Sequence, residues 1–121
     1  MTAARPINVG LVQMAMVDEP AANLERAIAG VREAAAKGAQ LVVLPELFRS
    51  RYFCQSEDAA FFGLAEAVPG PSTETLAALA KDLKITLVAS LFEKRAAGLF
   101  HNTAAVIDSE RGYVGKYRKM H

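Results

Sequence analysis

Two short stretches of this chain carry residue types that could do chemistry together. In residues 41–48, a run of four apolar residues ends at a proline, and Glu46 follows at once. Residues 115–121 place three cationic side chains within four positions and end in a histidine. A carboxylate can act as a general base, and a cation held beside it can stabilise a developing oxyanion. These are two of the three groups that an amide-hydrolysing site needs, the third being a nucleophile.

Glu46 stands where a strand is expected to end. In the strand expected at residues 40–44, the last four residues are apolar, as in strands buried on both faces, and Pro45 has no amide hydrogen with which to continue the pairing. In open α/β sheets, reacting groups gather beyond the carboxyl ends of the strands. Partial removal from water would raise the proton affinity of Glu46, as a general base near neutral pH requires. The alternative is a solvated strand-end glutamate, which this short pattern alone would favour.

The basic residues near the end of the chain lie on a candidate strand. If side chains alternate along it, Lys116 and Arg118 share one face and Lys119 lies on the other, but the pattern leaves open which face is inside. Lysines on an exposed edge strand also prevent aggregation, so a solvated edge is the alternative. Spacing alone does not bring Lys119 to Glu46.

The first half of the chain has the pattern of a strand–helix–strand unit. Residues 7–13 and 40–44 predict buried strands, and apolar residues at helical spacing predict a helix over residues 19–37. Acidic residues followed by Pro20 are typical of a helix start, and Gly38 is typical of a helix end. A right-handed crossover would make the two strands parallel.

The second half predicts a helix followed by three strands. Residues 57–67 suggest a short helix, residues 69–71 interrupt the chain, and Ser72 or Thr73 is expected to cap a helix that ends at Leu83. Three further strands, joined by tight turns, should form an antiparallel meander; they span residues 85–92, 99–107 and 113–117. The fold class is therefore α/β with a mixed sheet. Two amphipathic helices need one apolar platform, so we expect both on one face of the sheet, with the opposite face apolar.

Composition argues against several classes of protein. Hydrophobic residues make up 52% of the 121 residues, which argues against a disordered chain. A net charge of +1 argues against a basic surface that would bind nucleic acid. No apolar run approaches the roughly 20 residues of a membrane helix, and residues 1–6 lack the apolar core of a secretory signal. The single cysteine cannot form an internal disulfide, as expected of a cytoplasmic protein. Neither His101 nor His121 has a metal-like partner at useful spacing, so we expect no metal.

Five motifs, in the right order, resemble the carbon–nitrogen hydrolase (nitrilase) superfamily. Residues 44–48 and 117–121 resemble its glutamate and lysine motifs, and three further stretches match the same family in order: residues 7–13, 100–104 and 112–116. The resemblance covers essentially the whole chain. It implies the N-terminal half of a four-layer α-β-β-α sandwich, a Glu-Lys-Cys triad, and neither a metal nor an organic cofactor.

The resemblance also implies roles for individual residues. Glu46 would be the general base, and Lys119 would stabilise the oxyanion. Their side chains would therefore meet at one end of the sheet, where each should favour the charged form of the other, with burial opposing. Arg118 and His121 would support Lys119 by ordering the chain around it. The implied partner is a small amide or carbamoyl amine, and the implied assembly is a homo-oligomer.

A narrower resemblance lies in the loop after the glutamate. Residues 51–55 resemble those of the N-carbamoylputrescine amidases within this superfamily, which would place Tyr52 and Cys54 in a substrate loop. Another amidase of the superfamily, acting on ω-amides or aliphatic amides, is the first alternative. A non-catalytic α/β module that binds an acidic partner through its basic C-terminal strand is the second.

The nucleophile is where this sequence departs from the family pattern. In the family the nucleophilic cysteine follows the lysine motif, whereas this sequence ends at His121. Cys54 lies eight residues after Glu46 and outside any nucleophile motif, so we expect a packing or substrate-loop thiol. We therefore expect residues 1–121 to be the N-terminal portion of a single hydrolase domain, truncated before its nucleophile and inactive alone.

Overall fold

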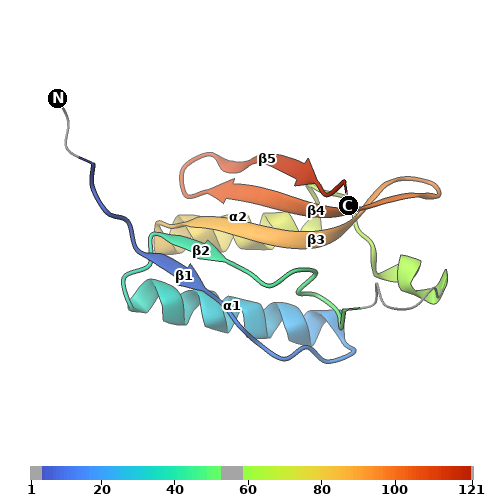
Figure 1. Ribbon diagram of the computed structural model, residues 1–121, viewed down its shortest axis with the longest axis horizontal. Coiled ribbons are helices and arrows are strands. Elements are labelled where there is room, and N and C mark those ends of the chain that lie inside the picture. The colour runs from blue at the N-terminus through green and yellow to red at the C-terminus, as the bar shows by residue number, and fades with distance from the viewer. Residues whose placement is uncertain (1–3, 53–58, 121) are drawn as a thin grey trace.

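A computed structural model of the chain describes residues 4–52 and 59–120. Within them, five strands form one sheet in the spatial order β1-β2-β3-β4-β5 (Figure 1). The strands are β1 (Val9–Leu11), β2 (Leu41–Val43), β3 (Thr86–Ala96), β4 (Leu99–Asp108) and β5 (Gly112–Arg118). The first three strands pair in parallel, and β3, β4 and β5 form an antiparallel meander. The predicted α/β class and mixed sheet are confirmed.

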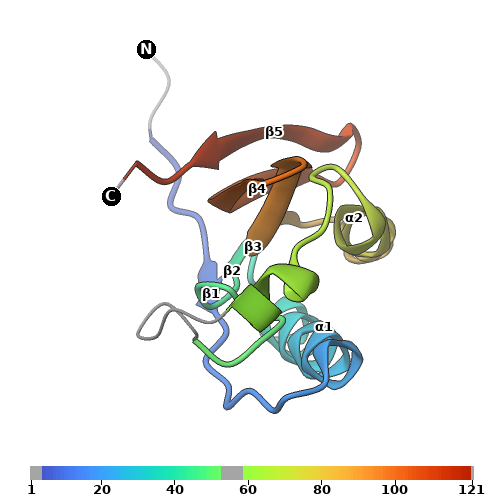
Figure 2. The ribbon, with the colours of Figure 1, turned by 90° about the vertical axis from the view of Figure 1, so that its right-hand side faces the viewer.

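Both α-helices cover the same face of this sheet. Helix α1 (Pro20–Ala36) and helix α2 (Pro71–Leu83) contact each other and the strands, and Figure 2 shows them side by side on one side of the sheet. The predicted arrangement is confirmed, and a doubly wound sheet is ruled out. We call the face without helices the open face. Strand alternation places the exposed side chains of Val9, Leu11 and Val106 on it, so the open face is partly apolar, as predicted.

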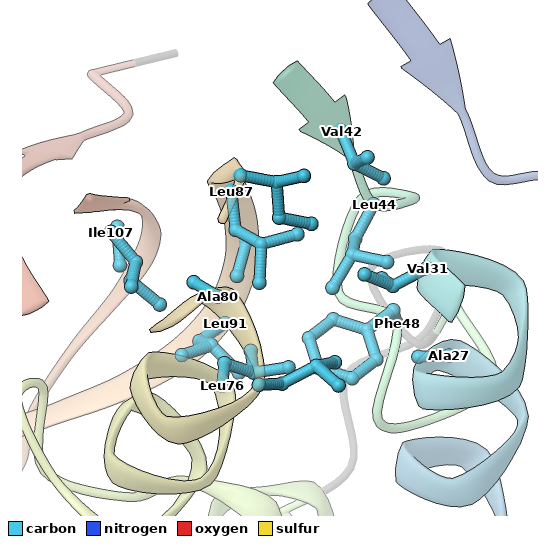
Figure 3. Close-up of a cluster of buried hydrophobic side chains, with 14 of the residues drawn as sticks. Ala27, Val31, Val42, Leu44, Phe48, Leu76, Ala80, Leu87, Leu91 and Ile107 are labelled. Carbon is cyan, nitrogen blue, oxygen red and sulfur yellow. The ribbon is translucent and has the colours of Figure 1, made fainter. Parts of the chain in front are cut away.

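The main core lies between the helices and the sheet. Ala27 and Val31 of α1 and Leu76 of α2 approach the strand side chains from one side (Figure 3). Phe48, which follows β2, is fully buried among them. Burying a phenylalanine contributes about 1.5–3 kcal/mol, so Phe48 anchors the segment that carries Glu46.

The two strands at the β1 edge are shorter and less buried than the sequence predicts. Residues 7–13 suggested a buried strand, but β1 covers Val9–Leu11, and both Val9 and Leu11 are exposed. In β2, Val42 is fully buried while its two neighbours are half-buried, so the expected burial on both faces is wrong. The physical reason is that helices cover one face only and that β1 is the edge of the sheet.

Helix α2 begins earlier than predicted. Gly70 is its N-cap and Pro71 its first residue, because proline suits the first helical position, so capping by Ser72 or Thr73 is wrong. Thr73 Oγ1 accepts the Gly70 amide hydrogen at 2.7 Å. Ser72 donates its amide and its hydroxyl hydrogen to the Glu66 carboxylate, a favourable charge at a helix N-terminus.

The other helical predictions hold in part. Helix α1 begins at Pro20, as expected, although Glu19 at its N-cap makes no side-chain cap hydrogen bond. In the segment 57–67, a 3₁₀-helix, η1 (Ala59–Leu64), stands where a short helix was predicted; residues 57 and 58 lie outside the described part. Among the helices described, none has the length and apolar character needed to cross a membrane.

Candidate active site

Glu46 and Lys119 meet at one end of the sheet, although 73 positions separate them. Lys119 Nζ donates a hydrogen bond to Glu46 Oε1 at 2.7 Å. Glu46 follows β2 and Lys119 follows β5, and both strands point toward the same end of the sheet (Figure 1). The side chains are 43% and 48% exposed, so the pair is open to a reactant. The predicted convergence of the two side chains is confirmed.

A strained turn places Glu46 at this end. The next residue, Leu47, has a φ of 51°, in the left-handed region that leucine rarely adopts. Its amide donates to Ser90 Oγ of β3 at 2.9 Å, and its side chain is buried. This hydrogen bond and the burial of Leu47 and Phe48 offset the strain and fix the backbone at Glu46.

The chain just beyond this turn is tied to both helices. The Arg49 carbonyl accepts a hydrogen bond from Asn23 Nδ2 of α1 at 2.9 Å. The Arg49 guanidinium forms an ion pair with Glu66. The Glu66 carboxylate also accepts a hydrogen bond from the Ser72 amide at the start of α2. Asn23 is fully buried and also bonds both main-chain polar groups of Val17. The helices therefore hold the turn that carries Glu46.

Strand β5 separates its cations between the two faces of the sheet. Lys116 and Arg118 face the helices, whereas Lys119 lies on the open face beside Glu46. The Lys119 amide donates to the Asn102 carbonyl of β4 at 2.8 Å, which extends the pairing one residue beyond β5. The face of β5 that carries Lys116 and Arg118 is therefore the inner one. The alternation expected from Lys116 to Lys119 is confirmed.

Arg118 belongs to a buried charge cluster on the helix side. Glu93 of β3 is 2% exposed and accepts hydrogen bonds from Lys116 at 2.5 Å, Arg118 at 2.8 and 3.0 Å, and Thr103 at 2.9 Å. The Arg118 hydrogen bonds are the largest cause that lowers the pKa of Glu93 to about 2. They also raise the pKa of Arg118. Arg118 points away from Lys119, so any support it gives acts through the position of β5.

Two polar residues of this site were not predicted from the sequence. Asn102 Nδ2 donates to Glu46 Oε1 at 2.7 Å, and Ser90 Oγ donates to Asn102 Oδ1 at 3.4 Å. The available signal was the match of residues 100–104 to a family motif, which contains Asn102. Nothing local in the sequence marks Ser90, because its place depends on how β3 pairs with β4.

The hydrogen-bond donors of Lys119 and Asn102 lower the pKa of Glu46. The Lys119 hydrogen bond lowers the pKa of Glu46 most, the Asn102 hydrogen bond lowers it further, and burial opposes them. Burial does raise the proton affinity of Glu46, as predicted, but the two hydrogen bonds outweigh this effect. The prediction that Lys119 favours the charged form is confirmed. Glu46 is ionised at neutral pH and able to accept a proton.

The remaining candidate residues are placed less completely. Tyr52 is half exposed in the segment after the Glu46 turn, whereas Cys54 and His121 lie outside the described residues. Their expected places in a substrate loop and beside Lys119 remain predictions. In residues 4–52 and 59–120, no group of three or more histidine, cysteine, aspartate and glutamate side chains could hold a metal ion.

Known proteins similar to this chain fall in one family. The family model described as carbon-nitrogen hydrolase matches residues 8–121. An N-carbamoylputrescine amidase of Oryza sativa subsp. japonica is 37% identical over 120 residues, which is 98% of this chain and 40% of the rice protein. The omega-amidase NIT2 of Homo sapiens is 37% identical over 114 residues, or 93% of this chain and 40% of the human protein. The chain thus spans about 40% of these curated relatives.

Solved structures agree with these relatives. A carbon-nitrogen hydrolase from Helicobacter pylori G27 matches 95% of this chain with a TM-score of 0.87 and 39% identity, over 40% of its own length. Saccharomyces cerevisiae Nit3, a member of the nitrilase superfamily, matches 95% of this chain with a TM-score of 0.79 and 30% identity, over 44% of its length. The α/β fold is therefore that of the N-terminal half of a nitrilase-superfamily enzyme. The chain belongs to the carbon–nitrogen hydrolase family.

Proposed function

We propose that residues 1–121 are the N-terminal portion of a carbon–nitrogen hydrolase that cleaves a non-peptide C–N bond in a small amide or carbamoyl amine. The observation that carries this proposal is the 2.7 Å contact between Lys119 Nζ and Glu46 Oε1 on the open face. The cysteine nucleophile would come from a part of the protein that follows these residues. We also infer a homo-oligomeric assembly, which the resemblance to the family implies, and a cytoplasmic location, which the single cysteine among these 121 residues favours.

In this mechanism Glu46 transfers protons and Lys119 stabilises charge. Glu46 accepts the thiol proton as the cysteine sulfur attacks the carbonyl carbon, and Lys119 faces the oxygen that becomes negative. The C–N bond breaks, the leaving nitrogen takes up the proton, and ammonia departs from a thioester-type intermediate. Glu46 then accepts a proton from water, whose oxygen attacks the intermediate, and the thiol forms again as the product leaves.

N-Carbamoylputrescine is the first candidate substrate. The loop at residues 51–55 and the similarity to the rice N-carbamoylputrescine amidase favour it. The products would be putrescine, ammonia and carbon dioxide, a step of polyamine biosynthesis. The equal identity to the human omega-amidase makes an ω-amide the second candidate.

The substrate assignment predicts a clear order of rates. We expect the full-length protein, encoded by the complete reading frame, to release ammonia from N-carbamoylputrescine with a higher kcat/KM than from ω-amides or short aliphatic amides. Initial rates of ammonia release measure this order, with putrescine quantified in the same samples. A higher kcat/KM for an ω-amide would transfer the assignment to the omega-amidase class and leave the C–N hydrolase mechanism in place.

A non-catalytic interaction module fits the structure less well. That reading needs cations on the C-terminal strand that are available to an acidic partner. Lys116 and Arg118 are instead paired with buried Glu93, and Lys119 is paired with Glu46. All three cations therefore already have carboxylate partners within the chain.

The 121-residue chain by itself is expected to hydrolyse no amide. A base and an oxyanion-stabilising cation without a thiolate cannot form an acyl intermediate, and loss of a nucleophile costs orders of magnitude in rate. In the full-length protein, Cys54→Ala should leave appreciable activity. Ammonia release by the isolated chain that disappears in its Cys54→Ala variant would instead identify Cys54 as the nucleophile.

A further inference from the structure

We propose that Asn102 and Ser90 are positioning residues that anchor Oε1 of Glu46 and leave Oε2 as the atom that accepts the proton. The inference rests on the proposed function for its catalytic consequence, whereas the positioning itself concerns contacts within this chain. It gives both residues a role that acts through Glu46.

Asn102 contacts both members of the central pair. Its side-chain Nδ2 donates to Glu46 Oε1 at 2.7 Å, and its main-chain carbonyl accepts the Lys119 amide hydrogen at 2.8 Å. One residue of β4 therefore sets the backbone position of the cation and the orientation of the carboxylate together. A displacement of Asn102 would change both.

The two donors to Glu46 approach the same oxygen. Lys119 Nζ and Asn102 Nδ2 each lie 2.7 Å from Oε1, and no donor from the described residues bonds Oε2. A carboxylate oxygen that already accepts two strong hydrogen bonds is the poorer proton acceptor. The geometry therefore leaves the Oε2 lone pairs for the proton of a thiol or of water.

Ser90 determines which end of the Asn102 amide faces Glu46. A rotation of the amide by half a turn would bring its oxygen against the carboxylate and repel it. The Ser90 hydroxyl accepts the Leu47 amide hydrogen at 2.9 Å, so its own hydrogen is available to Asn102 Oδ1 at 3.4 Å. This contact is long, but a donor at that position favours the rotamer that presents Nδ2 to Glu46. Ser90 thereby links the strained Leu47 turn to the orientation of the carboxylate.

The charges that act on Glu46 are few in the described part of the chain. Lys119 is the titratable side chain that faces it from beyond β5, and β3 and β4 present the uncharged Ser90 and Asn102. The charged cluster around Glu93 lies on the helix side, with the sheet in between. A change at Asn102 should therefore alter the titration of Glu46 directly.

The test uses the full-length protein and two readouts. The first is the pH profile of kcat/KM, and the second is the ¹³C NMR titration of the Glu46 side-chain carboxyl. Asn102→Asp keeps the shape of the side chain but replaces the donor by a second carboxylate. It should raise the pKa of Glu46, move the acid limb of kcat/KM to higher pH, and reduce kcat by roughly tenfold to a hundredfold with a smaller change in KM.

Variants of two hydroxyl residues separate positioning from general stability. Ser90→Ala should shift both readouts in the same direction as Asn102→Asp but less far, and Ser90→Thr, which keeps the hydroxyl, should restore the wild-type profile. Thr75→Ala is the control, because it also removes a hydroxyl group, one that donates to the main-chain carbonyl of Pro71 within α2. It should leave the acid limb in place.

The two readouts also separate this inference from the proposed function. Wild-type and Asn102→Asp proteins with the same Glu46 titration and the same acid limb would overturn the positioning role, even if Glu46→Gln abolishes activity. A shifted Glu46 titration in a protein that hydrolyses no C–N bond would support the positioning and overturn the proposed function.

Discussion

Replacing Glu46 by glutamine in the full-length protein is expected to reduce kcat/KM by roughly 10²–10⁴-fold, the usual contribution of a general base, while the protein folds normally. The glutamine amide keeps the shape of the side chain but cannot take a proton from a thiol or from water. Initial rates of ammonia release measure the loss, and circular dichroism checks the fold. Glu33→Gln, at an exposed glutamate of α1 paired with Lys37, is the control and should leave the rate unchanged.

The companion change Lys119→Ala should cost a similar amount. It removes the cation that faces the developing oxyanion, for which the loss of one preorganised donor typically costs about 10²–10³-fold in kcat. It also removes the largest cause that lowers the pKa of Glu46, so the acid limb of activity should move to higher pH. Full activity in Glu46→Gln would contradict the hydrolase mechanism. The hypothesis of a non-catalytic module that binds an acidic partner would then remain.

The second large effect concerns stability. Glu93→Ala is expected to lower the free energy of unfolding by about 3–5 kcal/mol, because it leaves the cations of Lys116 and Arg118 without their buried partner. Urea unfolding at neutral pH measures the change. Glu33→Gln is again the control: its ion pair with Lys37 has a carboxylate side chain that is 69% exposed, so the change should cost less than about 1 kcal/mol. A Glu93→Ala loss as small as that of the control would contradict a structural role for the cluster.

The same cluster predicts how stability depends on pH. The pKa of Glu93 is lowered from 4.5 to about 2, so its charged form is favoured in the folded state. The stabilisation is therefore complete above the unfolded-state value and is lost as the pH falls from 4.5 toward 2, by on the order of 3 kcal/mol. Glu93→Gln should lack this loss. Unfolding curves that fall equally with pH in the wild-type and Glu93→Gln proteins would assign the acid sensitivity to other groups.

Much of the fold follows from local pattern. Both predicted helices bury an apolar side, which includes Ala27 and Val31 in α1 and Leu76 and Ala80 in α2, because amphipathic spacing determines which side of a helix packs. Turn residues between the later strands were sufficient to predict the meander. An apolar run such as residues 41–44 does not show whether both faces of the strand are covered, which is why the burial of β1 and β2 was overestimated.

The site was predictable only in part, for a related reason. Glu46 and Lys119 stand beside recognisable sequence features, a strand-ending proline and a basic strand. Ser90 and Asn23 act through contacts between elements that are distant in sequence, and no local pattern identifies them. Asn102 is marked only by the family motif at residues 100–104. The direction of the Glu46 pKa also depends on these neighbours, since the effect of burial is outweighed by donors that come from β4 and from beyond β5.

A double-mutant cycle tests most directly whether Glu46 and Lys119 form one catalytic centre. The measurement is kcat/KM for ammonia release by the full-length wild-type protein, Glu46→Gln, Lys119→Ala and the double variant. Residues that act as a unit are strongly non-additive, so the double variant should be about as slow as the slower single variant. Losses that multiply in the double variant would mean that the two residues act independently, and a single variant with wild-type kcat/KM would contradict the shared site.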